Sequence, residues 1–269
     1  MPLYVVATPI GNLGDLTARA REVLAACDGV VAEDTRHSGN LLAHLGIKKP
    51  VYALPAFDES VRVEPLVRRL AGGESLALVT DAGTPAVSDP GAVLVRRAVE
   101  EGIAVVPVPG ASAAVAAVSV SGFREGRFHF AGFLPKKASH RAEMLAEMAV
   151  LRAQLVFYEA PQRVARTLGE LRAALGDRDA VVAREMTKLH EELARGKLSE
   201  LERRFAGEVR GEVVIVVRGA PEAVVDRAAL EVEVRARLGR GESPKAIAEA
   251  LSARHSKREV YQLALELKR

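Results

Sequence analysis

The sequence predicts an α/β protein with two layered domains and a C-terminal helical appendage. Short Val-rich runs alternate with stretches of helical periodicity over the first 220 residues, and the pattern beyond them is helical only. The chain has no Trp, and 4% of its residues are aromatic. Its core is therefore built mainly from Val, Leu and Ala, which favours a layered fold over a β-sandwich. A length of 269 residues is long for one compact domain and sufficient for two.

The first domain is expected over residues 1–120. Its strands are almost continuously apolar, which is typical of a parallel sheet covered on both faces. The predicted strands are 3–7, 29–33, 75–80 and 103–108, and the predicted helices are 16–27, 60–72 and 91–102. The uncharged stretch 103–123 is about long enough to span a membrane. Because prolines and a glycine interrupt it, a strand, a loop and a small-residue helix are favoured, with a membrane span as the alternative.

The second domain is expected over residues 121–220, beginning with the polar, glycine-bearing segment 121–127. A helix is predicted to begin with a capping box formed by Ser199 and Glu202. A hairpin is expected near residues 193–198, so the second sheet is predicted to be mixed. The other predicted strands are 128–133, 154–158, 180–184 and 212–218, and the other predicted helices are 139–151 and 161–175.

The appendage is expected over residues 221–269, with helices at 226–238, 243–253 and 256–267. A short helix, a tight turn and a helix with a basic start outline a helix-turn-helix. The formal net charge of +3 resides here, since residues 226–269 carry ten Lys and Arg against seven Asp and Glu. On charge alone, a solvated helical tail is favoured over a surface that binds a polyanion.

Three loops follow predicted strands and contain Gly and Pro but no Lys, Arg or His: residues 8–15, 81–91 and 109–113. Ligands of parallel sheets bind outside the carboxyl ends of the strands. Neither a P-loop nor a dinucleotide fingerprint is present. A phosphate ligand would favour cations, whereas Asp81, Thr84 and Ser112 suit a cationic, zwitterionic ligand. One such loop alone would be interpreted as a tight turn, but three together predict a binding cleft.

Six segments carry a resemblance to a known family: residues 3–17, 32–36, 81–91, 108–112, 157–161 and 184–188. They resemble the ribosomal RNA small subunit methyltransferase I family, which belongs to the tetrapyrrole-methylase-like (class III) methyltransferases. The resemblance covers residues 3–218, and the remainder resembles the helix-turn-helix often appended to this family. It implies a two-domain tetrapyrrole-methylase-like fold and a homodimer, with S-adenosylmethionine bound in the cleft.

The resemblance also implies the reaction and the partner. The expected reaction is methylation of the ribose 2′-hydroxyl of cytidine 1402 in 16S ribosomal RNA, as free RNA or in the assembled small subunit. The loops and the resemblance together predict the cofactor contacts Pro9, Ile10, Asp81, Gly83, Thr84, Pro85, Val87, Gly110, Ser112 and Ala113.

A ribose hydroxyl is a weak nucleophile that benefits from a proton acceptor. Five carboxylates near predicted strand ends are candidates: Glu33, Asp34, Asp81, Glu159 and Glu185. Glu159 and Glu185 are favoured, although each could be an ordinary loop carboxylate paired with a nearby Arg. Phosphate contacts require cations or other donors. The candidates for RNA contacts are Arg36, His37, Arg163, Arg184, Lys188, Lys257 and Arg258.

Other classes of site have little support in the sequence. The six His residues lack ligand spacing, so no metal site is predicted. The single cysteine, Cys27, is expected to be a buried small hydrophobe, and one cysteine favours a reducing compartment. The N-terminal residues lack the features of a signal peptide, so we expect a cytoplasmic protein without a membrane segment.

Two alternatives remain open. One is a methyltransferase of the same fold that acts on a small tetrapyrrole-type molecule. The other is a non-catalytic nucleic-acid-binding protein whose α/β body is a scaffold.

Overall fold

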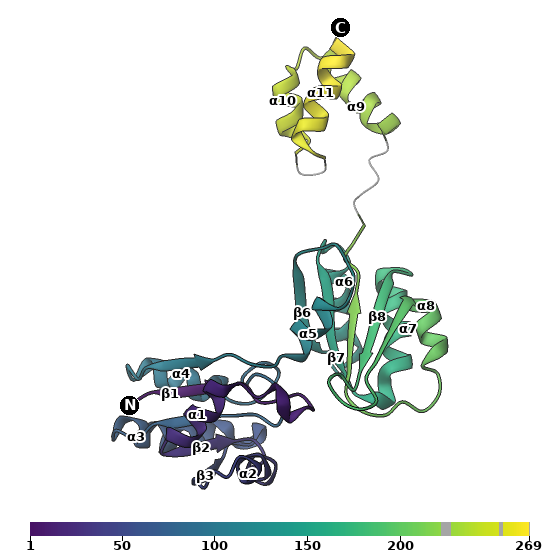
Figure 1. Cartoon of the computed structure of the whole chain (residues 1–269). Helices are drawn as coiled ribbons and strands as arrows, with labels where there is room; N and C mark the ends of the chain where they lie inside the picture. The colour runs from purple at the N-terminus through teal and green to yellow at the C-terminus, as the bar shows by residue number, and fades with distance from the viewer. Residues whose placement is uncertain (222–226, 253–254, 269) are drawn as a thin grey trace. The chain divides into compact units, whose positions relative to one another are not determined.

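The computed structural model describes residues 1–221, 227–252 and 255–268. The chain divides into two compact units, Met1–Ala220 and Pro221–Arg269 (Figure 1). The first unit contains two five-stranded sheets.

The first sheet is wholly parallel, with the strand order β3-β2-β4-β1-β5. This arrangement places β1 between β4 and β5, so the loops that follow these three strands leave the same edge side by side. Its strands are β1 (Leu3–Val6), β2 (Gly29–Ala32), β3 (Val51–Ala53), β4 (Leu76–Leu78) and β5 (Val105–Val108).

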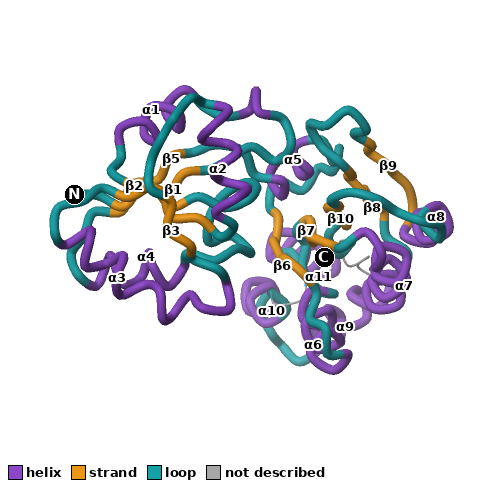
Figure 2. The backbone as a smooth tube through the Cα atoms, turned by 90° about the horizontal axis from the view of Figure 1, so that it is seen from below, coloured by secondary structure: helices purple, strands orange, loops and turns teal. Residues whose placement is uncertain are grey.

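Helices cover both faces of the first sheet, as Figure 2 shows. One face packs on α1 (Ala18–Ala26) and α2 (Thr35–His44) through residues such as Leu24 and Leu42. The other face packs on α3 (Glu59–Ala71) and α4 (Ala92–Glu100). Cys27 is fully buried in the first of these clusters, and burial raises the pKa of its thiol.

The second sheet is mixed and has the strand order β6-β7-β10-β8-β9, with only β6 and β7 parallel. Its strands are β6 (Phe128–Phe133), β7 (Gln154–Glu159), β8 (Asp179–Arg184), β9 (Glu192–Lys197) and β10 (Val213–Val217). The helices of this half are α6 (Ala138–Met148), α7 (Val164–Leu175) and α8 (Leu198–Arg204). A 3-10 turn, Pro161–Arg163, precedes α7.

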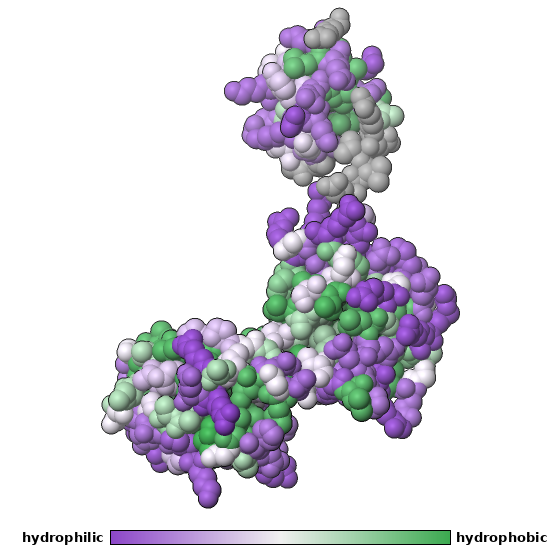
Figure 3. Space-filling view, in the orientation of Figure 1, coloured by the Kyte–Doolittle hydropathy of each residue, from purple (hydrophilic) through white to green (hydrophobic). Residues whose placement is uncertain are grey.

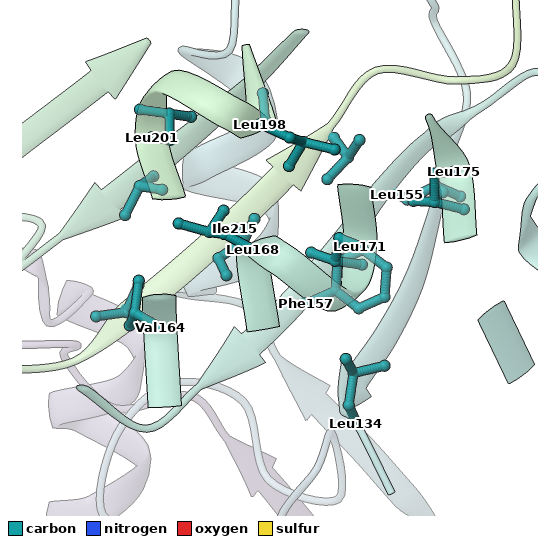
Figure 4. Close-up of a cluster of buried hydrophobic side chains, with 14 of the residues drawn as sticks. Leu134, Leu155, Phe157, Val164, Leu168, Leu171, Leu175, Leu198, Leu201 and Ile215 are labelled. Carbon is teal, nitrogen blue, oxygen red and sulfur yellow. The ribbon is translucent and has the colours of Figure 1, made fainter. Parts of the chain in front are cut away.

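Alternation along the strands of the second sheet creates two apolar faces. In β10, Ile215 joins the cluster covered by α6, α7 and α8, whereas Val214 and Val216 point to the opposite face. Figure 4 shows the first cluster, in which leucines of α7 and α8 surround Phe157 and Ile215. The opposite face packs on α5 (Ala113–Ser119) and on Ile10 from the first loop. This packing joins the loops of the first sheet to the second sheet.

The unit Pro221–Arg269 is helical. It contains α9 (Arg227–Gly239), α10 (Pro244–Ala250) and α11 (Lys257–Lys268), which share an apolar cluster. The Ser243 hydroxyl accepts a hydrogen bond from the Ala246 amide at 3.2 Å, as a helix N-cap does. Hydrophilic residues dominate the visible face of this unit (Figure 3). Two predicted helix ends, Asp226 and Ala253, lie outside the described residues.

The predicted fold class is confirmed, and most predicted elements are present within a few residues of their expected ends. The stretch 103–123 forms β5 and α5, and no helix among the described residues is long and apolar enough to cross a membrane. Two elements, β3 and α2, were not predicted from the sequence. The capping box at Ser199 is wrong, because the Ser199 hydroxyl donates to Asp177, and at the start of α8 the Glu200 carboxylate accepts instead from the Lys197 backbone amide.

Candidate functional site

The three glycine- and proline-bearing loops lie together at the carboxyl edge of the first sheet. The Thr8 amide donates to the Gly83 carbonyl at 2.8 Å, and the Gly83 amide donates to the Thr8 carbonyl at 3.1 Å. The Thr84 hydroxyl donates to the Ala111 carbonyl at 3.2 Å, which ties the second loop to the third. The loops therefore form one hydrogen-bonded wall.

Glycine is required at one point where these loops approach each other. A Cβ atom built on Gly110 would lie 2.9 Å from the Ala7 Cβ and 3.4 Å from the Ala7 carbonyl oxygen. A larger residue would separate β1 from the loop after β5.

A cavity of about 410 Å³ opens between this wall and the second sheet. We call it the acidic cavity, because its described lining includes five carboxylates but no Lys, Arg or His. Its volume is within the range of about 300–1,000 Å³ that is usual for small-molecule sites. The lining residues are Ile10, Glu33, Asp81, Ala82, Gly83, Thr84, Val87, Ser88, Asp89, Ser112, Ala113, Phe133, Tyr158, Glu159, Ala160, Pro161, Met186, Gly211, Glu212, Val213 and Val214.

Most of the predicted cofactor contacts line the acidic cavity: Ile10, Asp81, Gly83, Thr84, Val87, Ser112 and Ala113. Three do not. Pro9 lines a neighbouring cavity, Pro85 is buried, and Gly110 packs against Ala7. These three positions shape the loops, while the other seven face the cavity.

Negative charge accumulates in the acidic cavity. Burial raises the pKa of Glu33, and the nearby carboxylates of Asp89 and Asp81 raise it further. Burial also raises the pKa of Asp89. The buried Oδ1 atom of Asp81 has no hydrogen-bond partner among the described residues. A cationic group placed here would relieve this repulsion and supply the missing partner.

An aromatic group forms the side of the acidic cavity that belongs to the second sheet. The ring of Tyr158 makes edge contacts with Phe130 and Phe133, at centroid distances of 4.9 and 5.7 Å. The Tyr158 hydroxyl accepts a hydrogen bond from the Ala114 amide at the start of α5. Burial raises the pKa of Tyr158, so its hydroxyl stays protonated at neutral pH. The acidic cavity therefore combines carboxylates with an apolar aromatic surface.

Backbone strain is concentrated in two loops beside this cavity. Among the described non-glycine residues, those with left-handed φ angles are Ala86, Ser88, Glu185 and Thr187, at 64°, 65°, 52° and 67°. The first two lie in the loop after β4, and the others in the loop between β8 and β9. Such conformations cost about 1–3 kcal/mol each and are enriched at binding sites.

A second cavity, of about 720 Å³, adjoins the first. We call it the α2 cavity, because four residues of α2 form one of its sides. It shares Ile10, Asp81, Ala82 and Glu212 with the acidic cavity. Its other lining residues are Thr8, Pro9, Gly11, Leu13, His37, Asn40, Leu41, His44 and Lys188.

The two candidate proton acceptors are both occupied by hydrogen bonds. Glu159 lines the acidic cavity, but its side chain has no exposed area. Its carboxylate accepts from the Thr167 hydroxyl at 2.5 Å and from the Ala160 amide at 2.8 Å. Glu185 accepts from the Lys188 ammonium and from the Glu212 amide, and these bonds lower its pKa. The structure does not place Glu185 in the lining of either cavity.

The candidate RNA contacts are dispersed, and most have partners. Arg36 is 90% exposed at the start of α2 and pairs with Asp34, whose carboxylate caps that helix. His37 is exposed and lines the α2 cavity. The other pairs are Arg163 with Glu159, Arg184 with Glu192, Lys188 with Glu185 and Glu212, and Lys257 with Glu249. Arg258 is exposed on α11.

Sequence reasoning missed several residues that line the cavities. Asn40 and His44 were missed because α2 was not predicted. Met186 and Gly211 come from loops of the second sheet, and no local pattern marks them. No cluster of metal-binding side chains occurs among the described residues.

Comparison with known proteins identifies the family. Residues 2–202 match the family model of the tetrapyrrole (corrin/porphyrin) methylases. The chain belongs to this family. It is 50% identical over 224 residues to ribosomal RNA small subunit methyltransferase I of Xylella fastidiosa strain Temecula1, covering 82% of each chain. It is 42% identical over 275 residues to the protein of that name from Synechocystis, covering 98% of each chain. The resemblance to ribosomal RNA small subunit methyltransferase I is therefore confirmed.

Solved structures of tetrapyrrole methylases share the fold. Uroporphyrin-III C-methyl transferase from Thermus thermophilus matches with a TM-score of 0.61 and 18% identity, over 81% of this chain and 97% of that one. A structure of the same enzyme complexed with S-adenyl homocysteine matches with a TM-score of 0.60 and 20% identity, with the same coverage. Diphthine synthase matches with a TM-score of 0.61 and 18% identity, over 81% and 90%. These matches show that the part of the chain that forms the two sheets has the same fold as these enzymes.

Proposed function

We propose that this protein transfers a methyl group from S-adenosylmethionine to the ribose 2′-hydroxyl of cytidine 1402 in 16S ribosomal RNA. The protein is a member of an S-adenosylmethionine-dependent methyltransferase family. The observation that carries the proposal is the acidic cavity, which has carboxylates, hydroxyls and backbone groups but no cation in its described lining. The name shared by relatives at 42–50% identity supports ribosomal RNA as the substrate class.

The residues of the acidic cavity fit the cofactor. S-adenosylmethionine supplies an electrophilic methyl group on a positively charged sulfur and also carries an ammonium group. The unpartnered Oδ1 of Asp81 and the raised pKa values of Glu33 and Asp89 indicate a site that lacks positive charge. Thr84 and Ser112 would hold polar groups of the cofactor, and the ring of Tyr158 would cover its apolar parts.

The chain's main contribution to the rate is positioning. Methyl transfer requires the hydroxyl oxygen, the methyl carbon and the sulfur to lie in line, and such orientation can contribute about 7–11 kcal/mol. The hydrogen bonds between Thr8 and Gly83 and between Thr84 and Ala111 fix the loops that would set this line. The packing of Ile10 and α5 on the second sheet holds the opposite wall in place.

A proton acceptor for the hydroxyl would add about 10²–10⁴-fold. We propose Glu159 or Glu185 for this role. Glu159 is adjacent to the cavity but bonded to Thr167, and Glu185 is held by Lys188. Single-turnover methylation by Glu159→Gln and Glu185→Gln variants tests both. If each variant keeps the wild-type rate, the acceptor lies elsewhere, and Asp81, which borders both cavities, becomes the candidate.

The proposed setting is the cytoplasm, with a homodimer acting on small-subunit ribosomal RNA, free or assembled. Val115 and Val120 support an interface at α5, since 54% and 40% of their surfaces are exposed. The proposed RNA contacts are the basic residues named above: Arg36, His37, Arg163, Arg184, Lys188, Lys257 and Arg258. A tetrapyrrole substrate is less favoured, because the solved tetrapyrrole enzymes are only 18–20% identical to this chain.

Mapping the labelled nucleotide tests the proposed function. The full chain is incubated with methyl-labelled S-adenosylmethionine and either small ribosomal subunits, free 16S RNA or a precorrin, and the product is digested and analysed by mass spectrometry. We expect label on the ribose of one cytidine. Label on a base or on the precorrin would contradict the proposed reaction. Absence of cofactor binding in a calorimetric titration would favour a non-catalytic RNA-binding scaffold.

A further inference from the structure

The α2 cavity, of about 720 Å³, lies next to the acidic cavity and is not used by the proposed cofactor. Residues 37, 40, 41 and 44 are spaced so that they share one face of α2, and all four line the cavity. This face presents two imidazoles, one amide and one leucine. The opposite face of the helix buries Ser38 and Leu42. The polar side chains of α2 therefore line the cavity, while the buried side of the helix packs on the first sheet.

Lys188, from the loop between β8 and β9, also lines the α2 cavity. Its stem covers Gly11, where an added Cβ atom would lie 2.6 Å from the lysine Cγ and Cε atoms. Its ammonium lies 2.9 Å from Glu185 Oε1 and 2.9 Å from Glu212 Oε2. The loop between β8 and β9 is thus joined to the loop after β1 beside this space.

The α2 cavity and the acidic cavity meet at a shared wall formed by Ile10, Asp81, Ala82 and Glu212. The unpartnered Oδ1 of Asp81 belongs to this wall. A molecule in the α2 cavity would therefore lie beside a cofactor in the acidic cavity. An acceptor group that enters from the α2 side would reach the acidic cavity at this wall.

We propose that the α2 cavity holds the nucleotide that receives the methyl group. Its base and phosphate would contact His37, Asn40 and His44, and its ribose would lie against the Asp81 wall. Imidazoles stack on unpaired bases, and an amide can both donate to a base edge and accept from it. The imidazole and amide side chains of His37, Asn40 and His44 differ in chemistry from the carboxylates of the acidic cavity. Such a difference is expected where an anionic substrate binds beside a cationic methyl donor. This inference rests on the proposed function and deepens it by naming the substrate subsite.

The test compares a double variant, Asn40→Ala/His44→Ala, with His140→Ala in the full chain. His140 is an exposed histidine of α6 that lines neither cavity, so it is the matched control. Two lost contacts of about 1 kcal/mol each predict that the double variant binds 16S RNA about 10- to 30-fold more weakly. Its affinity for S-adenosylmethionine should stay within twofold of the wild type, and the control should match the wild type in both.

Filter binding measures RNA affinity whether or not methyl transfer occurs, and calorimetry measures cofactor affinity. Unchanged RNA affinity in the double variant would overturn the inference. An equal loss of cofactor affinity would also overturn it, since the cavity would then belong to the cofactor site. Failure of the wild type to methylate RNA, together with loss of RNA binding in the double variant, would refute the proposed function while supporting this subsite.

Discussion

The two neighbouring cavities differ in their basic side chains although they share a wall that contains the carboxylates of Asp81 and Glu212. The acidic cavity is lined by carboxylates, with no Lys, Arg or His among its described residues, whereas the α2 cavity contains two imidazoles, an amide and an ammonium. The carboxylates come mainly from loops after parallel strands, and the imidazoles come from one helix face. The difference shows that, among the described residues, basic and amide side chains are confined to the α2 side of the shared carboxylates Asp81 and Glu212, whereas the charged side chains of the acidic cavity are carboxylates alone.

The first and largest effect is expected at the shared wall. Asp81→Asn keeps the shape of the side chain but removes its charge. Because hydrogen bonds to charged groups contribute about 1.5–3 kcal/mol, we expect S-adenosylmethionine to bind about 10- to 150-fold more weakly. Calorimetric titration measures the change. Asp15→Asn is the control, since Asp15 is exposed and lines neither cavity. Equal affinities in both variants and the wild type would show that Asp81 does not hold the cofactor.

The second effect concerns pH and the charge of the ligand. The pKa of Glu33 is raised, so the free protein retains this proton as pH rises above the ordinary carboxyl range. A cationic ligand favours the ionised carboxylate, so affinity for S-adenosylmethionine should rise as pH rises through the raised pKa and then level off. S-adenosylhomocysteine, which lacks the sulfonium charge, should show a smaller rise.

The Glu33→Gln variant should remove the difference in pH dependence between S-adenosylmethionine binding and S-adenosylhomocysteine binding. A change of one pKa unit corresponds to about tenfold in affinity, so we expect a loss of about three- to tenfold in the preference for S-adenosylmethionine at neutral pH. Glu22→Gln, on the exposed side of α1, is the control. A preference that is unchanged in Glu33→Gln at all pH values would argue against charge matching in the acidic cavity.

The same carboxylate affects stability with the opposite sign. The native state binds the Glu33 proton more tightly than the unfolded chain, so its contribution to stability is present at low pH and is lost as pH rises through the raised pKa. Thermal unfolding without ligand should therefore show a higher melting temperature for Glu33→Gln than for the wild type at pH 8, and a smaller difference at pH 4. A lower melting temperature at pH 8 would contradict the assumed repulsion.

The smallest effect is expected in the helical unit. Arg258 is exposed near the start of α11, whereas the neighbouring Lys257 is already paired with Glu249. If Arg258 contacts a phosphate, Arg258→Ala should weaken RNA binding and reduce the slope of log affinity against log salt by about 1. Titrations of 16S RNA at several salt concentrations measure the slope. Lys257→Ala serves as a comparison, and an unchanged slope in Arg258→Ala would exclude the contact.

The acidic cavity was more predictable from the sequence than the α2 cavity, for physical reasons. The loops at Asp81 and Ser112 contain Gly and Pro, follow apolar strands and lack cations, and these local features predict a ligand site at a sheet edge. By contrast, α2 contains Ser, Gly and Asn, which are poor helix formers, and it is stabilised by the Asp34 cap and by burial of Leu42. No short pattern in the sequence indicates that this cap and this burial stabilise the helix.

The partners of the charged residues could not be predicted for a related reason. Glu185 directly follows β8 and Glu212 directly precedes β10, and the antiparallel pairing of these strands brings both to the Lys188 ammonium. The Glu159 carboxylate was expected near the cleft, but the hydroxyl of Thr167, one turn into α7, occupies one of its oxygens. Such pairs depend on tertiary packing, so no short spacing of residues in a single sequence predicts them.

The burial of Cys27 has a practical consequence for work with this protein. Its thiol is fully enclosed between the first sheet and its helices, and its raised pKa keeps it protonated. Since the thiolate is the reactive form, maleimide reagents should leave the native protein unmodified. One cysteine introduced at an exposed position, such as Gln262 on α11, would therefore carry a single fluorophore without removal of the natural residue.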